Sequence, residues 1–215
     1  MKFKDLTFKQ KVEHILHYYS GIFIGFVIFA IAAASLIYTM FIKKPTQNFC
    51  GIAIYNSFLS IEDNISLTDK LNKDIGVPEG ASVNIQSYYD DKADVTTLAN
   101  LNQKFNTYLY TGEIGIVITD KKFTADFIAA DYYMPLTDYF SREQIKELEK
   151  ESLLLYGEDD KGNSKPYAVK ITDNYIITEY KLFENAETDI YMAIIPQMEP
   201  ENTLKVFKWL LGRKL

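Results

Sequence analysis

The residues that could carry chemistry in this chain are carboxylates, hydroxyls and amides rather than histidines or thiols. The 215 residues include two histidines, His14 and His17, and one cysteine, Cys50. Both histidines precede a long apolar stretch, so the sequence after it offers no histidine for Ser-His-Asp or Cys-His catalysis. No cysteine or second acidic residue accompanies the two histidines at zinc-site spacing. We therefore expect no catalytic residue, no metal site, no cofactor and no enzymatic activity.

The acidic pairs of the chain predict turns rather than sites. Asp90 with Asp91 and Asp159 with Asp160 are adjacent in sequence, and neither pair has a spacing that indicates a shared proton. The stretch 158–165 (EDDKGNSK) resembles a calcium loop only faintly, because it lacks the alternating acids and the terminal glutamate. We expect a hairpin turn there. The chain also lacks the glycine-rich phosphate-binding motifs.

Polar and aromatic side chains follow three predicted strands, where a ligand would meet the edge of an open sheet. Amide, hydroxyl, aromatic and acidic groups at one edge suit a small polar or cationic ligand. The alternative is that these side chains cap helices and pack the rim, with Asp120 as a helix N-cap. The candidate ligand-binding residues are Asn56, Ser57, Ser87, Tyr88, Tyr89 and Asp120.

The elements that must position these residues alternate between strands and helices in the first half. Apolar stretches rich in β-branched residues predict strands, and the third, which is nearly all apolar, should be central. Strand-helix-strand order predicts right-handed crossovers and an open α/β sheet. The predicted strands are 50–59, 81–89 and 114–119, and the helices between them are 66–74 and 93–110.

The second half is less regular and predicts a mixed sheet. A helix should follow Asp120, and Ser141 with Gln144 has the spacing of a capping box at the start of the next one. The predicted helices are 121–130, 141–150 and 201–211, and the predicted strands are 153–156, 167–171, 175–183 and 190–195.

A charge-free run of 25 residues at 18–42 predicts one membrane-spanning helix. At about 1.5 Å per residue it reaches roughly 37 Å, enough for a hydrocarbon core of about 30 Å. A cleavable signal peptide is the alternative, but the apolar run is longer than a secretory core. The sequence therefore predicts a cytoplasmic segment at 1–17, a retained anchor at 18–42, and a C-terminal domain at 45–215.

Lysines predict the orientation of this anchor. Four of them, at positions 2, 4, 9 and 11, precede the span, whereas Lys43 and Lys44 follow it. The positive-inside rule then places the N-terminus in the cytoplasm and the C-terminal domain outside. Gly21 and Gly25 lie four apart in the span, a spacing that can bring two helices together as a homodimer. Ordinary small-residue content in a single helix is the alternative.

The C-terminal domain is acidic. From residue 45 onward the chain has 17 Lys and Arg against 27 Asp and Glu, a net charge of minus ten. This charge argues against nucleic acid or another polyanion as its partner. The single cysteine allows no disulfide within the chain, so the domain must be stable through its core alone.

The C-terminal domain resembles type II periplasmic (extracytoplasmic) solute-binding proteins. The resemblance lies in residues 113–140, where a strand ending in Asp leads into a helix and a Pro-Leu turn, and in the stretches 165–171 and 190–211. Residues 9–29 are similar to the anchor region of membrane-tethered proteins of Gram-positive bacteria. True solute-binding proteins have two full lobes, however, and this domain is too short for both. The resemblance therefore implies a reduced fold, with at most a small second lobe at about 121–173.

The sequence predicts a membrane-anchored, solute-binding-like module at the cell surface, acting as a receptor, sensor or accessory factor. Its ligand would be a small polar solute. The alternative is a cell-envelope docking module that keeps the fold, lacks a small-molecule pocket and binds another envelope protein.

Overall fold

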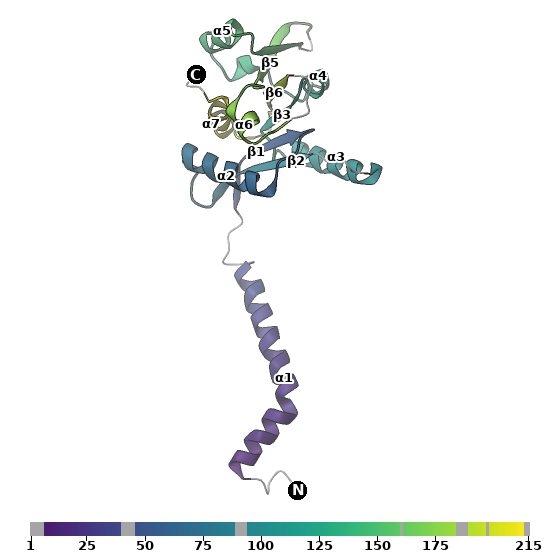
Figure 1. Cartoon of the computed structure of the whole chain (residues 1–215), viewed down its shortest axis with the longest axis vertical. Coiled ribbons are helices and arrows are strands. Elements are labelled where there is room, and N and C mark those ends of the chain that lie inside the picture. The colour runs from purple at the N-terminus through teal and green to yellow at the C-terminus, as the bar shows by residue number, and fades with distance from the viewer. Residues whose placement is uncertain are drawn as a thin grey trace. The chain divides into compact units, whose positions relative to one another are not determined.

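The chain divides into two compact units, Met1–Pro45 and Thr46–Leu215, in a computed structural model (Figure 1). The residues it describes are 7–39, 46–88, 94–159, 161–183, 189–196 and 198–212, with the side chains of 10 and 14–19 left outside. The predicted ligand residue Tyr89, the pair Asp90 and Asp91, and the two histidine side chains fall outside this description.

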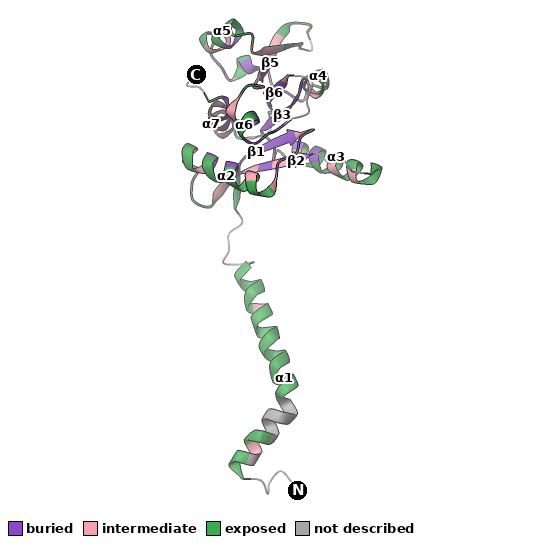
Figure 2. Cartoon of the chain, viewed as in Figure 1, coloured by how far each residue is buried: buried purple, intermediate pink, exposed green. Residues whose placement is uncertain are grey.

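The N-terminal unit contains one long helix, α1 (Phe8–Ile37). Its stretch Ser20–Ile37 has a mean hydropathy of 2.4 and none of it is buried, as Figure 2 shows along this helix. This stretch is long and apolar enough to span a membrane, as an anchor or as a signal sequence. A Cβ atom at Gly21 or Gly25 would meet nothing within 4 Å. The proposed dimer through these glycines stays a prediction.

The second unit is built on one six-stranded mixed sheet, as the alternation of strands and helices predicted. The strand order is β2-β1-β3-β6-β5-β4. β1 runs parallel to β2 and β3, β6 runs antiparallel to β3 and β5, and β4 runs antiparallel to β5. The strands are β1 (Gln47–Tyr55), β2 (Ala81–Tyr88), β3 (Ile116–Asp120), β4 (Leu154–Glu158), β5 (Ser164–Lys170) and β6 (Ile190–Ile194).

Helices cover both faces of this sheet, because the strands alternate apolar side chains between two core clusters. On β1, Ile52 and Ile54 join the larger cluster, whereas Ala53 between them joins the smaller one. The larger cluster is closed by α2 (Ile61–Ile75), α5 (Arg142–Lys150), α6 (Tyr175–Glu179) and α7 (Pro200–Leu211). The smaller is closed by α3 (Val95–Tyr110) and α4 (Lys121–Ala129). β3 is buried along its whole length, as predicted for a central strand.

Local sequence signals explain where several helices begin. The Ser141 hydroxyl oxygen accepts a hydrogen bond from the backbone N–H of Gln144, and the Gln144 side-chain oxygen accepts one from the backbone N–H of Ser141, so the predicted capping box forms. Helix α2 begins five residues earlier than predicted, because Ser60 is its N-cap and accepts from the backbone N–H of Asp63. Its end at Gly76, in the left-handed region with φ 70°, agrees with the prediction.

The strand predicted at 175–183 is wrong, because that segment forms helix α6 and a following turn. The Asn174 side-chain oxygen accepts from the backbone N–H of Ile176 and caps the helix. Ile176 and Ile177 are buried in the larger core cluster. A short apolar run fits a buried helix as well as a strand, and the N-cap decides between them here.

The segment 121–173 does not build a second lobe. Its strands β4 and β5 extend the same sheet through β6, and residues 46–215 form one compact unit. The expected hairpin joins β4 and β5. Asp159 forms its turn, because one carboxylate oxygen accepts from the backbone N–H groups of Lys161 and Asn163. These bonds and the Lys165 ammonium hold the pKa of Asp159 far below its usual value.

Candidate functional site

The predicted ligand residues lie at one edge of the sheet. Because β1, β2 and β3 are parallel, their carboxyl ends meet there. Helices α2 and α3 leave this edge toward opposite faces, which places the topological switch point between β1 and β3. Asn56 and Ser57 follow β1, Ser87 lies near the end of β2, and Asp120 ends β3. The structure therefore places these four near the switch point.

Asn56 and Asp120 bond to each other across the switch point. The Asn56 amide nitrogen donates to Asp120 Oδ2 at 2.8 Å. The other carboxylate oxygen, Oδ1, accepts from the backbone N–H of Phe123 at 3.0 Å and caps α4. Asn56 has φ 65°, a left-handed conformation that asparagine tolerates better than most residues. The N-cap role expected of Asp120 is confirmed, and both of its oxygens have partners.

The serines of this edge hold loops together. Ser87 Oγ donates to the carbonyl oxygen of Ser57, and so ties the end of β2 to the loop after β1. Ser57 is buried, and its hydroxyl oxygen accepts from the backbone N–H of Phe183 at 3.0 Å. These bonds link three segments that are far apart in sequence. A ligand at this edge would have to compete with bonds the protein already makes.

Tyr88 points into the core rather than out at the edge. Its side chain is 5% exposed and its ring packs edge-on against Phe105 at 5.1 Å between centroids. Its hydroxyl donates to Gln86 Oε1 at 3.1 Å. Burial raises the pKa of Tyr88, with the nearby Tyr108 and Glu113 adding to the effect. The structure therefore buries the Tyr88 side chain in the smaller core cluster, while its carbonyl oxygen accepts from the backbone N–H of Asn56 at 3.4 Å.

Two buried hydroxyls near this edge were not singled out from the sequence. Thr119 Oγ1 and Tyr133 Oη are buried and, among the described side chains, are polar atoms without a hydrogen-bond partner. Burial first, and the charge of Asp120 second, raise the pKa of Tyr133 well above its usual value. Tyr133 belongs to the smaller core cluster. Its neighbours in the sequence, Tyr132 and Met134, gave no sign of a polar role.

A cavity of about 450 Å³ lies at the same edge of the sheet, at the end of β5. Lys170 ends β5 and pairs with Tyr191, and the adjacent Ile190 pairs with Asp120, so both strand ends share this edge. We call this space the β5-end cavity. It is lined by Glu151, Leu153, Lys170, Ile171, Thr172, Asp173, Asn174, Tyr175, Leu211 and Gly212.

Hydrogen bonds and an ion pair hold the walls of the β5-end cavity. Lys170 Nζ lies 2.7 Å from Asp189 Oδ1. The Thr172 hydroxyl oxygen accepts from the backbone N–H of Ile190 at 2.9 Å. The Asn174 amide donates to the carbonyl oxygen of Leu210 at 2.9 Å, which joins α6 to the end of α7. This site could not be predicted from the sequence, because its lining comes from separate segments that meet only in the folded domain.

The loop after β1 and the first turns of α2 also expose apolar side chains. Phe58 is 64% exposed, Ile61 79% and Ile65 57%. Ile61 and Ile65 lie four residues apart, so they share one face of the helix. These three residues form what we call the α2 apolar surface. It lies at the carboxyl end of β1, the opposite end from Gln47, where the chain enters the domain.

Two observations concern the reactive groups of this domain. Among the described residues there is no group of three or more His, Cys, Asp or Glu side chains that could hold a metal ion. Cys50 is fully buried, and burial raises the pKa of its thiol to about 12. A thiol that stays protonated at neutral pH is a poor nucleophile.

Comparisons with protein-family models, with curated proteins and with solved structures gave no match. The resemblance to type II solute-binding proteins therefore stays a prediction, and the fold is described by its own topology, a mixed α/β domain on a six-stranded sheet.

Proposed function

We propose that this chain is a single-pass, membrane-anchored module whose C-terminal domain binds a small solute outside the cell and is not an enzyme. The N-terminal segment would lie in the cytoplasm, as the lysines before the span indicate. The proposed relation to solute-binding proteins concerns one lobe, since residues 46–215 form one unit on one sheet.

The β5-end cavity is the observation that carries this proposal. Its 450 Å³ fall within the usual range for small-molecule sites, and its walls combine polar groups with apolar side chains. It lies at the strand-end edge where open α/β sheets bind their ligands. Of the ligand residues predicted at the ends of the first three strands, Asn56 and Asp120 instead bond to each other. The proposed site is therefore displaced along the same edge.

A thermal-shift screen tests the proposal. The full chain in detergent micelles would be heated with a library of small polar solutes, and we expect at least one to raise the melting temperature. A Leu153→Trp variant should fill the β5-end cavity and abolish that shift. Leu155→Trp is the matched control, because Leu155 lies two residues away and lines a different cavity, of about 280 Å³. No shift in the whole screen, or a shift that survives Leu153→Trp, would contradict the proposal.

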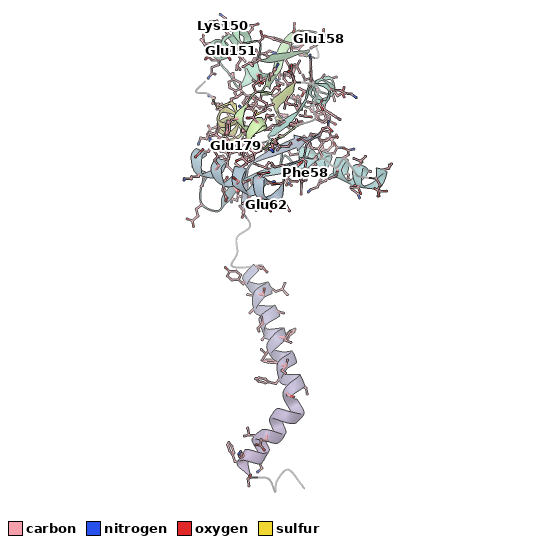
Figure 3. All side chains as sticks on the ribbon, in the orientation of Figure 1. Phe58, Glu62, Lys150, Glu151, Glu158 and Glu179 are labelled. Carbon is pink, nitrogen blue, oxygen red and sulfur yellow. The ribbon has the colours of Figure 1, made fainter. Side chains whose placement is uncertain are left out.

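The α2 apolar surface favours a second candidate, docking of another envelope protein. Clustered exposed apolar residues commonly mark interaction sites. Glu62, which is exposed, lies between Ile61 and Ile65 in the sequence; Figure 3 labels Phe58 and Glu62. The partner segment should therefore combine apolar and basic residues.

Crosslinking in membranes separates this candidate from solute binding. A docking module should give a stoichiometric crosslinked species with one protein, identified by mass spectrometry. Ile61→Ser should weaken it, whereas Val95→Ser, which changes a residue that is 84% exposed on α3, should leave it unchanged. Equal crosslinking in both variants would count against docking at the α2 apolar surface.

A further inference from the structure

Strand β4 ends the sheet on its side, with a strand beside it on one edge only. Just outside either end of β4, the Leu153 carbonyl oxygen accepts from the last residue of β5, and the Asp159 N–H donates to the residue before β5. Hydrogen bonding alternates along an antiparallel pair of strands. The backbone N–H and carbonyl groups that point away from β5 are therefore those of Leu154, Tyr156 and Glu158.

A proline on β5 agrees with this alternation. Pro166 pairs with Tyr156 and has no N–H to donate, so it fits a position that forms no hydrogen bond between the two strands. Among the described residues, no hydrogen bond reaches the outward backbone groups of Tyr156 and Glu158, whereas asparagines of α2 bond to those of the other edge strand, β2. An uncovered edge is a template for one more strand.

A groove lies along this edge, between β4 and α4. It is the cavity of about 280 Å³, lined by Ala125, Ile128 and Ala129 of α4 and by residues 155–158 of β4. A Cβ atom at Gly157 would overlap Ile128 Cγ2, so the helix approaches the strand closely there. We call this space the β4-edge groove. Aliphatic side chains from the helix make it suitable for an apolar side chain of a strand paired with β4.

The side chains of β4 alternate between two faces of the sheet. Gly157 faces α4, whereas the Tyr156 hydroxyl donates to Glu149 Oε1 of α5 at 3.0 Å. Glu158 follows the same alternation and is exposed; Figure 3 labels it. A strand added to β4 would therefore place one set of side chains in the β4-edge groove and the other set beside carboxylates.

The charge of the domain favours a basic partner over a second copy of this chain. From residue 45 onward the net charge is minus ten, so two copies would repel each other. The hairpin segment 158–165 has three acidic residues and two lysines, and one of these, Lys165, is paired with Asp159 at 3.0 Å. Helix α5 has three basic and three acidic residues, which balance. Lys121 and Lys122 lie in the first turn of α4, ahead of the residues that line the groove.

We propose that β4 pairs with an extended segment of a partner protein, which places an apolar side chain in the β4-edge groove and a basic side chain beside Glu158. The segment would extend the sheet by one strand. Main-chain hydrogen bonds would supply affinity, and the groove would supply specificity. This inference is independent of solute binding, because the groove and the β5-end cavity share no lining residue.

Hydrogen exchange tests whether the edge is open. The full chain in nonionic detergent micelles would be followed by NMR. The amides of Tyr156 and Glu158 should exchange at least tenfold faster than those of Leu155 and Gly157, which the alternation places in bonds to β5. Equal protection at all four positions would overturn the proposal.

A blocked peptide of seven residues, alternating lysine and valine, is the probe for the partner. We expect it to bind the full chain in a calorimetric titration and to protect the amides of Tyr156 and Glu158 from exchange. The same peptide with glutamate in place of lysine should bind at least tenfold more weakly, because the domain is acidic. The proposal is wrong if the lysine peptide does not bind, if it leaves both amides unprotected, or if the glutamate peptide binds equally well.

Substitutions test the groove and its charge. Ala125→Trp should fill the groove and weaken binding of the lysine peptide at least tenfold, whereas Ala99→Trp, at an exposed alanine of α3, is the matched control and should leave it unchanged. Glu158→Gln should weaken it about threefold, as expected for one exposed ion pair. Equal binding to the two tryptophan variants would overturn the groove assignment. If the Tyr156 and Glu158 amides become protected as the chain concentration rises without peptide, the occupant is a second copy and the partner assignment is wrong.

Discussion

At the residue scale, Cys50 shows how strongly the core changes one side chain. It lies on β1 with none of its surface exposed, and its sulfur lies 3.7 Å from the Gly51 carbonyl oxygen and 4.0 Å from the Thr203 hydroxyl oxygen. Burial penalises the thiolate more than the weak contact with Thr203 favours it, so the pKa rises to about 12. The thiol is therefore a packed apolar group in the folded domain.

This pKa predicts how stability changes with pH. An unfolded thiol ionises near pH 9, whereas the folded Cys50 keeps its proton up to about pH 12. The unfolded state alone then loses protons, so stability falls above pH 9, by at most about 1.4 kcal/mol per pH unit. Denaturant unfolding between pH 8 and 10.5 should show a smaller decrease in the free energy of unfolding for Cys50→Ala than for the wild type. If the free energy of unfolding falls equally steeply with pH in both chains, the buried-thiol account is wrong.

Asp120 gives a second prediction at this scale, because one carboxylate supports both α4 and the loop after β1. Asp120→Ala removes the N-cap and leaves the Asn56 amide without its partner, so the free energy of unfolding should fall by about 1 to 3 kcal/mol. Ser141→Ala, at the exposed N-cap of α5, should lower the free energy of unfolding by about 1 kcal/mol. Urea titration measures both variants. An Asp120 variant that loses no more stability than the Ser141 variant would show the Asn56 bond to be unimportant.

At the element scale, the edge strand β2 is protected by the helix beside it. β2 is the last strand on its side of the sheet, and its sequence has no proline or charged residue to discourage pairing. Asn72 on α2 accepts from the backbone N–H of Val83 at 2.9 Å, and Asn64 donates to the carbonyl oxygen of Ile85 at 2.9 Å. Two asparagine side chains thus form hydrogen bonds with the backbone N–H and carbonyl groups that another strand would otherwise pair with.

Removing this protection should have two effects. Asn72→Ala leaves the Val83 N–H unpaired, which should lower the free energy of unfolding by about 1 to 2 kcal/mol. The freed edge should also promote self-association, visible as concentration-dependent mass in light scattering of the full chain in micelles. Lys73→Ala, one residue away and exposed, is the control and should change neither quantity. A variant that stays as monodisperse as Lys73→Ala would argue against edge protection.

Elements with clear start signals could be predicted from the sequence, and those set by packing could not. The strands β1, β2, β3 and β6 and the helices α3, α4, α5 and α7 lie within a few residues of their predicted bounds. Segment 175–183 was assigned wrongly, because its apolar run is too short to distinguish helix from strand. Asn56 and Asp120 could be predicted to share an edge, but their mutual bond depends on a left-handed residue that sequence periodicity does not reveal. The β5-end cavity depends on how α5, α6 and α7 pack, which local patterns cannot give.

At the scale of the whole molecule, the proposed membrane attachment and the proposed solute binding belong to different units of the chain. The apolar stretch of α1 buries nothing within the chain, so its burial must come from a bilayer or from other helices. The domain has its own two-sided core, and its proposed solute-binding groups all lie at the strand-end edge. The chain enters the domain at Gln47, at the other end of β1. The proposed solute-binding groups and the point where the chain enters the domain therefore lie at opposite ends of the central strands.

The proposed membrane arrangement predicts which side of the membrane each part faces. In a Cys50→Ala background, Ser66→Cys on α2 should react with a membrane-impermeant maleimide on intact cells. Thr7→Cys, ahead of the span, should react only after permeabilisation. Both positions are exposed, so accessibility differs by side alone. A retained anchor also keeps the full mass of 24.8 kDa in the membrane fraction. A mass reduced by the N-terminal helix would indicate a cleaved signal sequence. The reversed labelling pattern, with Thr7→Cys reactive on intact cells and Ser66→Cys protected, would place the β5-end cavity in the cytoplasm, and its solute would then be a cytoplasmic one.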